Sequence, residues 1–284
     1  MNALSVLLAL VAALLFAIGT VLQQKGAMEE TAAEALRAGF LIKLMRKPVW
    51  LVGVVTDVTA YLAQAAALGV GKLVVVQPLL VVSLVFALPL GVKLTGQHVG
   101  RRDILGAGVV CAGLALFMVV ADPRGGRSDA RPMQWVIAGI VVAAVAGALA
   151  LVGARRRPAL KAALFGTSAG VIFGLVAAMT KATVDRFDDG ALHVIADWHL
   201  YALVGASVIG FVLSQISLQA GALAPALAST MVFETIIGVV VGIVLLQEEL
   251  HRSIWGNAVA AVALVTILGG VVLLAREREV ATTS

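Results

Sequence analysis

The chain has 284 residues, of which 61% are hydrophobic and only 13% are charged, and its formal net charge at pH 7 is +5. So few charged residues argue against a soluble globular protein and indicate a chain whose solvent is a lipid bilayer. In such a chain the positive charge reports membrane topology, and we expect no nucleic-acid partner.

The apolar residues fall into nine runs of about 20 residues, the length that a helix needs to span about 30 Å of hydrocarbon. The runs cover residues 3–23, 50–69, 73–94, 103–121, 134–153, 160–182, 200–219, 224–246 and 254–275. The first run is too long for the core of a signal peptide and has nothing basic before it, so we interpret it as a membrane helix. We therefore expect an all-α, polytopic protein of the cell membrane with nine transmembrane helices.

Lysine and arginine are distributed unevenly between the two sets of links and helix ends. One set carries fourteen of them: Lys25, Arg37, Lys43, Arg46, Lys47, Lys93, Arg101, Arg102, Arg155, Arg156, Arg157, Lys161, Arg276 and Arg278. The other set carries seven: Lys72, Arg124, Arg127, Arg131, Lys181, Arg186 and Arg252. Because basic residues accumulate on the cytoplasmic side, this distribution predicts an N-terminus outside the cell and a C-terminus in the cytoplasm.

The two halves of the chain are related by a weak internal repeat with an offset of 150 residues. The matched positions include Leu68, Gly71 and Leu73 with Leu218, Gly221 and Leu223, and Gln97, Arg102, Ile104 and Gly106 with Gln247, Arg252, Ile254 and Gly256. The fifth run matches neither half, and this extra crossing inverts the second repeat relative to the first. We expect a 4+1+4 inverted-repeat arrangement, as in many secondary transporters, with repeats at 1–121 and 159–284 and a linking helix within 122–158.

Several segments resemble those of known transporters. GTVLQQKG, ALGVGKLVVVQP and RRDILGAGVVCAGLALF resemble parts of the small multidrug resistance unit. FAIGTVLQQKGAM, KPVWLVG, VVVQPLLVVSLVFALPL and GIVLLQEEL are similar to segments of NIPA-type proteins. Over nearly its whole length the chain resembles the drug/metabolite transporter (DMT, EamA-like) superfamily, closest to its NIPA-type magnesium transporter branch, which has nine helices. The resemblance implies transport of a small solute or of magnesium.

At the positions of this chain that match functional acids of these relatives, the acids are absent. Phe16 occupies the position of the glutamate that small multidrug resistance proteins use in their first span. Tyr61, Leu62, Ala63 and Gln64 stand where NIPA-type proteins carry a Gly-Glu run and an asparagine. The mechanism of the small multidrug resistance proteins therefore cannot be carried over to this chain.

Two acids stand inside apolar runs. Glu234 lies near the middle of the eighth run, in MVFETIIGVV, and Asp57 lies about seven residues into the second. An ionised side chain at the centre of a membrane helix costs about 2.5–3.5 kcal/mol, so each acid needs a partner or a function. We interpret Glu234 as the candidate coupling acid, because a carboxyl group in a low dielectric can load and release a proton. The alternative is that Glu234 is protonated and only bridges helices. The position that corresponds to Glu234 in the first repeat is occupied by Leu84.

Polar side chains near these acids, and amides in other runs, extend the candidate site. The expected substrate- or ion-binding residues are Glu234, Asp57, Gln64, Tyr61, Gln215, Gln77 and Thr230. Membrane amides commonly bridge helices, so for each amide a packing role stays open. Gly166, Gly170 and Gly174, one turn apart, predict a close helix contact instead.

Three functions are compatible with these features. The first is a secondary transporter that moves a small metabolite or drug-like solute by alternating access, with proton coupling. The second is a magnesium or other divalent cation transporter in which Glu234 and Asp57 hold the metal, since Mg²⁺ needs only one or two carboxylates beside its waters. The third is a structural membrane scaffold without transport.

Other classes of function are not supported by the sequence. There is one cysteine, Cys111, the histidines lie in links or at helix ends, and no hydrolase, zinc or nucleotide motif occurs. We therefore expect neither an enzyme nor a cofactor. The expected partners are the substrate and the lipid bilayer, and a homodimer is left open by the sequence.

Overall fold

The computed structural model describes residues 2–29, 39–96, 100–120, 124–186, 191–220 and 223–249, together with residues 258–259, 262–263, 265–266 and 269. The ninth predicted run, 254–275, lies largely outside these residues, and so does the predicted cytoplasmic C-terminus. Both stay predictions.

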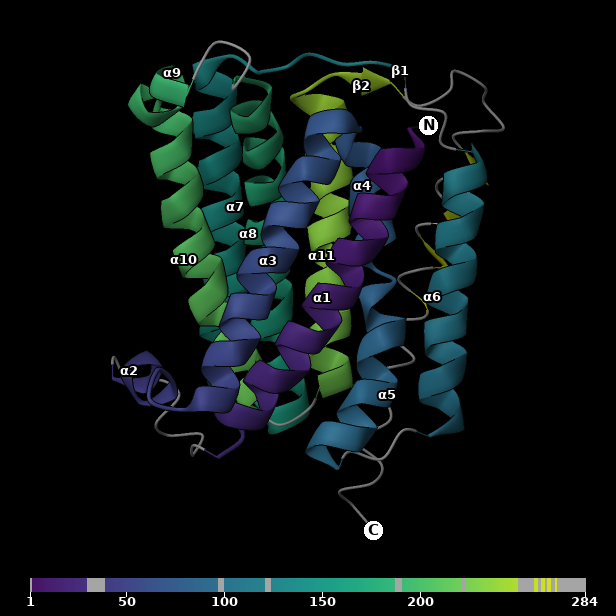
Figure 1. The fold of residues 1–284 in the computed structure, drawn as a ribbon, viewed down its shortest axis with the longest axis vertical. Coiled ribbons are helices and arrows are strands. Elements are labelled where there is room, and N and C mark those ends of the chain that lie inside the picture. The colour runs from purple at the N-terminus through teal and green to yellow at the C-terminus, as the bar shows by residue number, and fades with distance from the viewer. Residues whose placement is uncertain are drawn as a thin grey trace.

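Helices account for nearly all of the described chain, as expected (Figure 1). They are α1 (Ala3–Ala27), α2 (Phe40–Leu44), α3 (Pro48–Val70), α4 (Leu73–Leu80), α5 (Ser83–Thr95), α6 (Arg101–Val120), α7 (Pro132–Gly153), α8 (Pro158–Asp185), α9 (Ala191–Ala196), α10 (Trp198–Gln219) and α11 (Leu223–Val244). Within the described residues, seven segments are long and apolar enough to cross a membrane: α1, α3, α4 with α5, α7, α8, α10 and α11. The protein is thus a helical, membrane-embedded one. The fourth predicted run is also helical, as α6, but it is not among the seven.

Helix starts follow from local residue chemistry. The side chain of Asn2 accepts the amide of Leu4 at 3.1 Å and caps α1. Asp197 caps α10 in the same way. α3, α7 and α8 each begin with a proline, which suits the first helical turn because its missing N–H has no partner there.

The third predicted run, 73–94, consists of two helices. Pro78 lies inside α4, where it removes one helical hydrogen bond. The amide of Val81 then bonds to the carbonyl of Pro78 and that of Val82 to Leu79, each over 3.2 Å and three residues back, before α5 begins. The expected single helix is therefore broken near the middle of the span.

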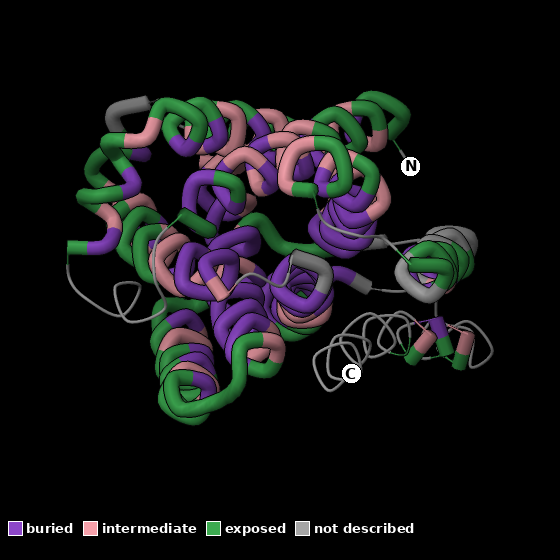
Figure 2. Tube along the Cα trace, turned by 90° about the horizontal axis from the view of Figure 1, so that it is seen from below, coloured by how far each residue is buried: buried purple, intermediate pink, exposed green. Residues whose placement is uncertain are grey.

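The core of the bundle lies around α8 and α11. α1 with α3 and α8 with α11 are the most extensive helix pairs. A Cβ built on Gly170 would come within 2.3 Å of the backbone oxygen of Thr230, and Gly166 and Gly174 approach α11 similarly. The predicted close contact at these glycines is thereby confirmed. Figure 2 shows the buried residues gathered in the middle of the bundle and the exposed ones around it.

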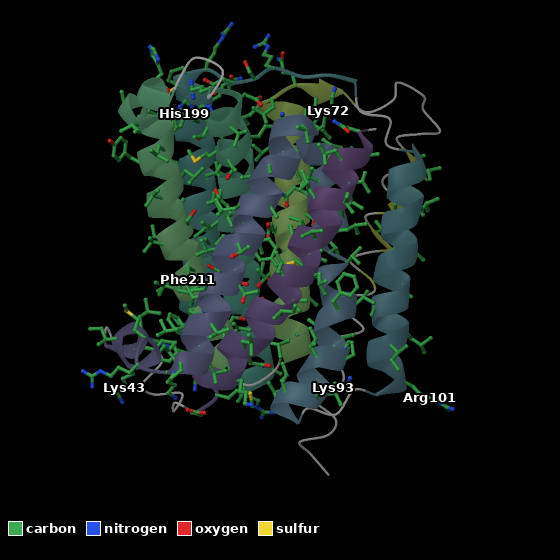
Figure 3. All side chains as sticks on the ribbon, in the orientation of Figure 1. Lys43, Lys72, Lys93, Arg101, His199 and Phe211 are labelled. Atoms are coloured by element: carbon green, nitrogen blue, oxygen red, sulfur yellow. The ribbon has the colours of Figure 1, made fainter. Side chains whose placement is uncertain are left out.

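The two ends of the bundle carry different groups. Figure 3 shows Lys43, Lys93 and Arg101 at the end where α2 lies, and Lys72 and His199 at the opposite end, which also holds α9. We name these the α2 end and the α9 end. The only strands among the described residues, β1 (Arg124–Gly125) and β2 (Glu248–Glu249), pair antiparallel at the α9 end, a small departure from the all-α expectation.

Candidate functional site

A cavity of about 410 Å³ lies among α1, α3, α8, α10 and α11. Five of the predicted substrate- or ion-binding residues line it: Asp57, Tyr61, Gln64, Thr230 and Glu234. The two intramembrane acids, which come from distant parts of the sequence, therefore border one space. Sequence alone left their proximity open.

Asp57 lies on α3 where this helix packs against α1. Its Oδ2 accepts a hydrogen bond from the side-chain amide of Gln23 at 2.5 Å. Its Oδ1 is shielded from solvent and has no hydrogen-bond partner among the described residues. Gly19 makes room for this oxygen, because a Cβ at Gly19 would come within 2.0 Å of it. Asp57 is thus an incompletely satisfied acid at the cavity wall.

Gln23 belongs to a hydrogen-bond relay that crosses three helices. The indole Nε1 of Trp50, on α3, donates to Oε1 of Gln215, on α10, at 2.8 Å. The amide of Gln215 donates to Oε1 of Gln23 on α1, and Gln23 donates to Asp57. Gln215 is buried, with 1% of its surface exposed. It does not line the cavity, however, and reaches the site only through Gln23.

Glu234 lies on α11 and is 7% exposed. Its carboxyl is hydrogen-bonded to the side chain of Gln64, on α3. On the same helix the hydroxyl of Tyr61 lies 2.5 Å from that of Thr180, on α8. The hydroxyl of Thr230 bonds to the carbonyl of Ala226 within α11. Around the second acid, polar contacts therefore join α3 to both α11 and α8.

Gln77 is the other predicted site residue that the structure places outside the cavity wall. It is fully buried on α4 and packs against Gly238 of α11, where a Cβ would come within 2.8 Å of its Cγ. In the described part of the chain its side-chain amide has no hydrogen-bond partner, while its backbone carbonyl accepts the hydroxyl of Thr235 at 3.2 Å. These contacts place Gln77 in the packing between α4 and α11.

Most of the cavity wall is apolar, and it lies toward the α2 end. Phe16, Phe173 and Phe211 contribute aromatic rings. α1 lines the cavity with residues of its second half, α10 with residues between Ser207 and Leu218, α11 with residues between Ala226 and Glu234, and α2 adds Leu41. Figure 3 shows Phe211 on the half of α10 that lies nearer the α2 end.

Glu248 joins distant parts of the chain at the α9 end. Its carboxylate accepts the backbone amides of Leu73 and Val74, at 3.1 and 3.0 Å, and is 2% exposed. A carboxylate at a helix N-terminus satisfies amides that have no partner within the helix and interacts favourably with the helix dipole. Glu248, which follows α11, therefore caps α4.

Arg186 organises a second contact at the α9 end. Its guanidinium lies 2.5 Å from Oδ2 of Asp129 and 3.1 Å from Oδ2 of Asp197. Trp135 donates to the other oxygen of Asp129 at 2.9 Å, and His199 bonds to Asp197 through backbone and ring. Burial alone would raise the pKa of the Asp197 carboxyl, but the bonds from His199 and the charges of His199 and Arg186 lower it below its usual value.

A preformed metal centre is not evident in the described ranges, which contain no group of three or more His, Cys, Asp or Glu side chains able to hold an ion. Asp57 and Glu234, the predicted ligands of a divalent cation, do line the same cavity. Each of them is already bonded to a glutamine side chain.

Sequence reasoning missed the roles of Trp50 and Glu248. A tryptophan beside Pro48 at the start of a span is typical of the membrane interface, so a buried bond of its indole was not expected. The available signal was the pair Gln23 and Gln24, because two amides at the end of an apolar run must find partners when buried. Glu248 gave no signal, since its bonds are to backbone amides far away in the sequence.

No protein-family model and no solved structure matches the chain. An uncharacterized protein of Corynebacterium glutamicum is 32% identical to it over 276 residues, which make up 97% of this chain and 96% of that protein. The chain belongs to the same family as that corynebacterial protein. Because the match covers nearly all of both members, the family likeness extends over the whole chain and is not confined to one segment.

Proposed function

We propose that the chain is a secondary transporter of the drug/metabolite (EamA-like) superfamily, which moves a small metabolite or drug-like solute by alternating access with Glu234 as its coupling acid. One observation carries the proposal: Asp57 and Glu234 line a single cavity among helices of both predicted repeats. Its volume of about 410 Å³ lies within the range of about 300–1,000 Å³ that is usual for sites of small organic ligands.

The hydrogen bond between Glu234 and Gln64 supports the proposed proton coupling. An ionised carboxylate only accepts hydrogen bonds, whereas a protonated one has lost its charge and carries an O–H donor. Gain or loss of a proton at Glu234 therefore changes the contact between α11 and α3 at the cavity wall. A proton can drive transport only if it favours one conformation over another, and this contact provides such a difference.

Alternating access requires that one end of the cavity closes while the other opens. The cavity lies toward the α2 end. At the α9 end, the capping of α4 by Glu248 and the contacts of Arg186 hold distant parts of the chain together. Opening the α9 end would break the cap on α4. The predicted inverted repeat offers a route, because its two units can exchange conformations around a central site.

The proposed topology keeps nine helices in a 4+1+4 arrangement in the cell membrane, with the N-terminus outside. The common placement of Lys43, Lys93 and Arg101 at the α2 end supports a cytoplasmic position for that end. The cavity would then face the cytoplasm.

Magnesium transport is the second candidate, since two carboxylates border one cavity. Mg²⁺ dehydrates reluctantly and usually keeps several waters, which need polar groups around them. The rings of Phe16, Phe173 and Phe211 and the bonds of Asp57 and Glu234 to glutamines suit an organic solute better. A scaffold without transport would need no such cavity.

The test is solute-dependent proton movement in proteoliposomes that contain a pH-sensitive dye. Solutes of five kinds are added under an imposed pH gradient: an organic cation, an organic anion, a zwitterion, a neutral solute and Mg²⁺. The proposal expects proton movement with at least one organic solute. Mg²⁺ flux alone would favour the second candidate, and the absence of flux with every solute would contradict transport.

A further inference from the structure

The short helix α2 carries apolar residues that the bundle does not cover. Phe40 and Leu44, one helical turn apart, are 3% and 0% exposed and pack in one cluster with Trp50. This contact fixes α2 beside the start of α3, at one edge of the bundle (Figure 1). Ile42 and Met45 point elsewhere, because they are 60% and 59% exposed. One side of α2 is therefore anchored in the protein, and a second apolar side is open.

The position of α2 in the chain places this open side near the membrane surface. Only residues 45–47 separate the end of α2 from Pro48, where the membrane-spanning helix α3 begins. A short helix at this depth lies where lipid headgroups meet the ends of spanning helices, and its apolar side chains reach the acyl chains below.

Basic residues lie next to the open apolar side. Lys43 on α2 and Arg46 just after it are both exposed, and helical residues three positions apart lie on the same face. Figure 3 shows Lys43 at the outer edge of the bundle. Residues 37–47 of the sequence include four basic residues and no acid. Lys47 is held within the protein, since its Nζ lies 2.9 Å from a carboxylate oxygen of Glu29.

This combination of groups matches an anionic phospholipid. Its phosphate pairs with Lys43 and Arg46, and its acyl chains cover Ile42 and Met45. A soluble anion would leave the two apolar side chains in water, and a zwitterionic lipid would bring its own ammonium group to compete for the phosphate. Basic side chains near a membrane surface attract anionic lipid, each by a factor of about five.

α2 also forms part of the cavity wall. Leu41, whose neighbours in the chain are Phe40 and Ile42, lines the cavity and packs in the same cluster as Phe211, which lines it too. A lipid that holds α2 in place therefore also holds Leu41 in the wall.

We propose that α2 is a docking surface for anionic phospholipid, in which Lys43 and Arg46 bind the phosphate, Ile42 and Met45 contact the acyl chains, and the bound lipid keeps Leu41 in the cavity wall. Lipid binding requires no transported solute, so this inference is tested independently of the proposed function.

The test places an environment-sensitive nitrobenzoxadiazole dye at residue 42, as Ile42→Cys in a Cys111→Ser background that leaves no other cysteine. The full chain is reconstituted in phosphatidylcholine nanodiscs that contain a rising fraction of phosphatidylglycerol with the same acyl chains. We expect a blue shift of the dye emission that saturates with this fraction. The proposal would be overturned by the lack of a saturable shift, or by an equal shift when inorganic phosphate is added to phosphatidylcholine nanodiscs.

Two pairs of substitutions, each removing two positive charges, separate α2 from the general charge of the α2 end. Lys43→Gln with Arg46→Gln should raise the half-saturating fraction of phosphatidylglycerol at least about fivefold, or abolish saturation. Arg155→Gln with Arg156→Gln, exposed in the link between α7 and α8, should leave it unchanged. Equal effects of the two pairs would overturn the assignment to α2.

A charge-conserving pair controls for folding. Lys43→Arg with Arg46→Lys should bind phosphatidylglycerol like the wild type, because both positive charges remain. Weak binding by this pair, with an unchanged unfolding temperature, would contradict recognition by charge.

The effect on the cavity is measured with Leu41→Cys in the same Cys111→Ser background. A water-soluble maleimide should label residue 41 more slowly in phosphatidylglycerol than in phosphatidylcholine nanodiscs, because the bound lipid favours the conformation in which this residue lies in the wall. The same comparison with the Lys43→Gln and Arg46→Gln pair should show no difference between the lipids. Equal labelling rates in both lipids without that pair would overturn the link between α2 and the cavity.

Discussion

Asp57 lies so close to Gly19 that a Cβ on that glycine would come within 2.0 Å of Oδ1 and 2.9 Å of the carboxyl carbon. α1 and α3, which form one of the two most extensive helix pairs, thus meet at an acid and a residue without a side chain. The position of Asp57 at the cavity wall depends on this missing side chain.

Gly19→Ala is therefore expected to abolish transport and to destabilise the protein by about 1–3 kcal/mol, because the added methyl group must displace the carboxyl group or separate the helices. Gly139→Ala on α7 is the matched control, since nothing lies within 4 Å of a Cβ there. Proteoliposome flux and thermal unfolding in detergent measure both effects. Normal flux in Gly19→Ala would show that the placement of Asp57 is not needed.

Gly170→Ala is expected to destabilise the bundle. Its Cβ would meet backbone atoms of Thr230 and Glu234, at 2.3 and 3.0 Å, and backbone cannot move aside as a side chain can. Overpacking of this kind costs about 1–3 kcal/mol, occasionally more. Gly147→Ala, in open space on α7, should leave the melting temperature unchanged or slightly raised. Equal melting temperatures for Gly170→Ala and Gly147→Ala would contradict the close contact of α8 with α11.

Glu248→Gln should lower stability by about 1–2 kcal/mol, because the amide oxygen replaces only part of a charged cap that accepts the amides of Leu73 and Val74. Glu29→Gln is the control, since Glu29 is exposed and pairs with Lys47 at the surface. Thermal unfolding measures the difference. If the two variants melt alike, the cap does not stabilise the α9 end.

Asp197→Asn should lower the melting temperature at pH 7, and the difference from the wild type should shrink as the pH falls below about 4. Burial would raise the pKa of Asp197, but its bonds with His199 and the nearby charges of His199 and Arg186 lower it from the usual value of 3.8. A carboxylate with a lowered pKa in the folded state stabilises above the unfolded-state value and loses this effect as the pH falls through the folded-state value. Melting curves from pH 7 to about pH 3 test this, and a constant difference would contradict it.

Helix positions could be predicted from the sequence, because hydrocarbon thickness and apolar runs fix them to within a few residues. The break after Pro78 was less accessible, since a proline near the start of a span is normally tolerated. Asp57, Tyr61, Gln64, Thr230 and Glu234 were identified because an acid inside an apolar run is costly and its polar neighbours share its face.

Contacts between helices could not be predicted in the same way. Nothing in the sequence joins Trp50 to Gln215, which lie 165 positions apart, and the pairing depends on how α3, α1 and α10 pack. For the same reason Gln215 and Gln77 were expected at the site, although one acts through Gln23 and the other packs against Gly238. A polar residue in a span signals a need for partners but does not identify them.

The most direct test of the central claim is proton movement driven by a transported solute in Glu234→Gln and Glu29→Gln, reconstituted in equal amounts. Glu234→Gln keeps the shape of the side chain and cannot exchange a proton, while Glu29 is exposed and does not line the cavity. With both variants folded, we predict that coupled proton movement is lost in Glu234→Gln and kept in Glu29→Gln. Unchanged proton movement in folded Glu234→Gln would contradict the assignment of Glu234 as the coupling acid.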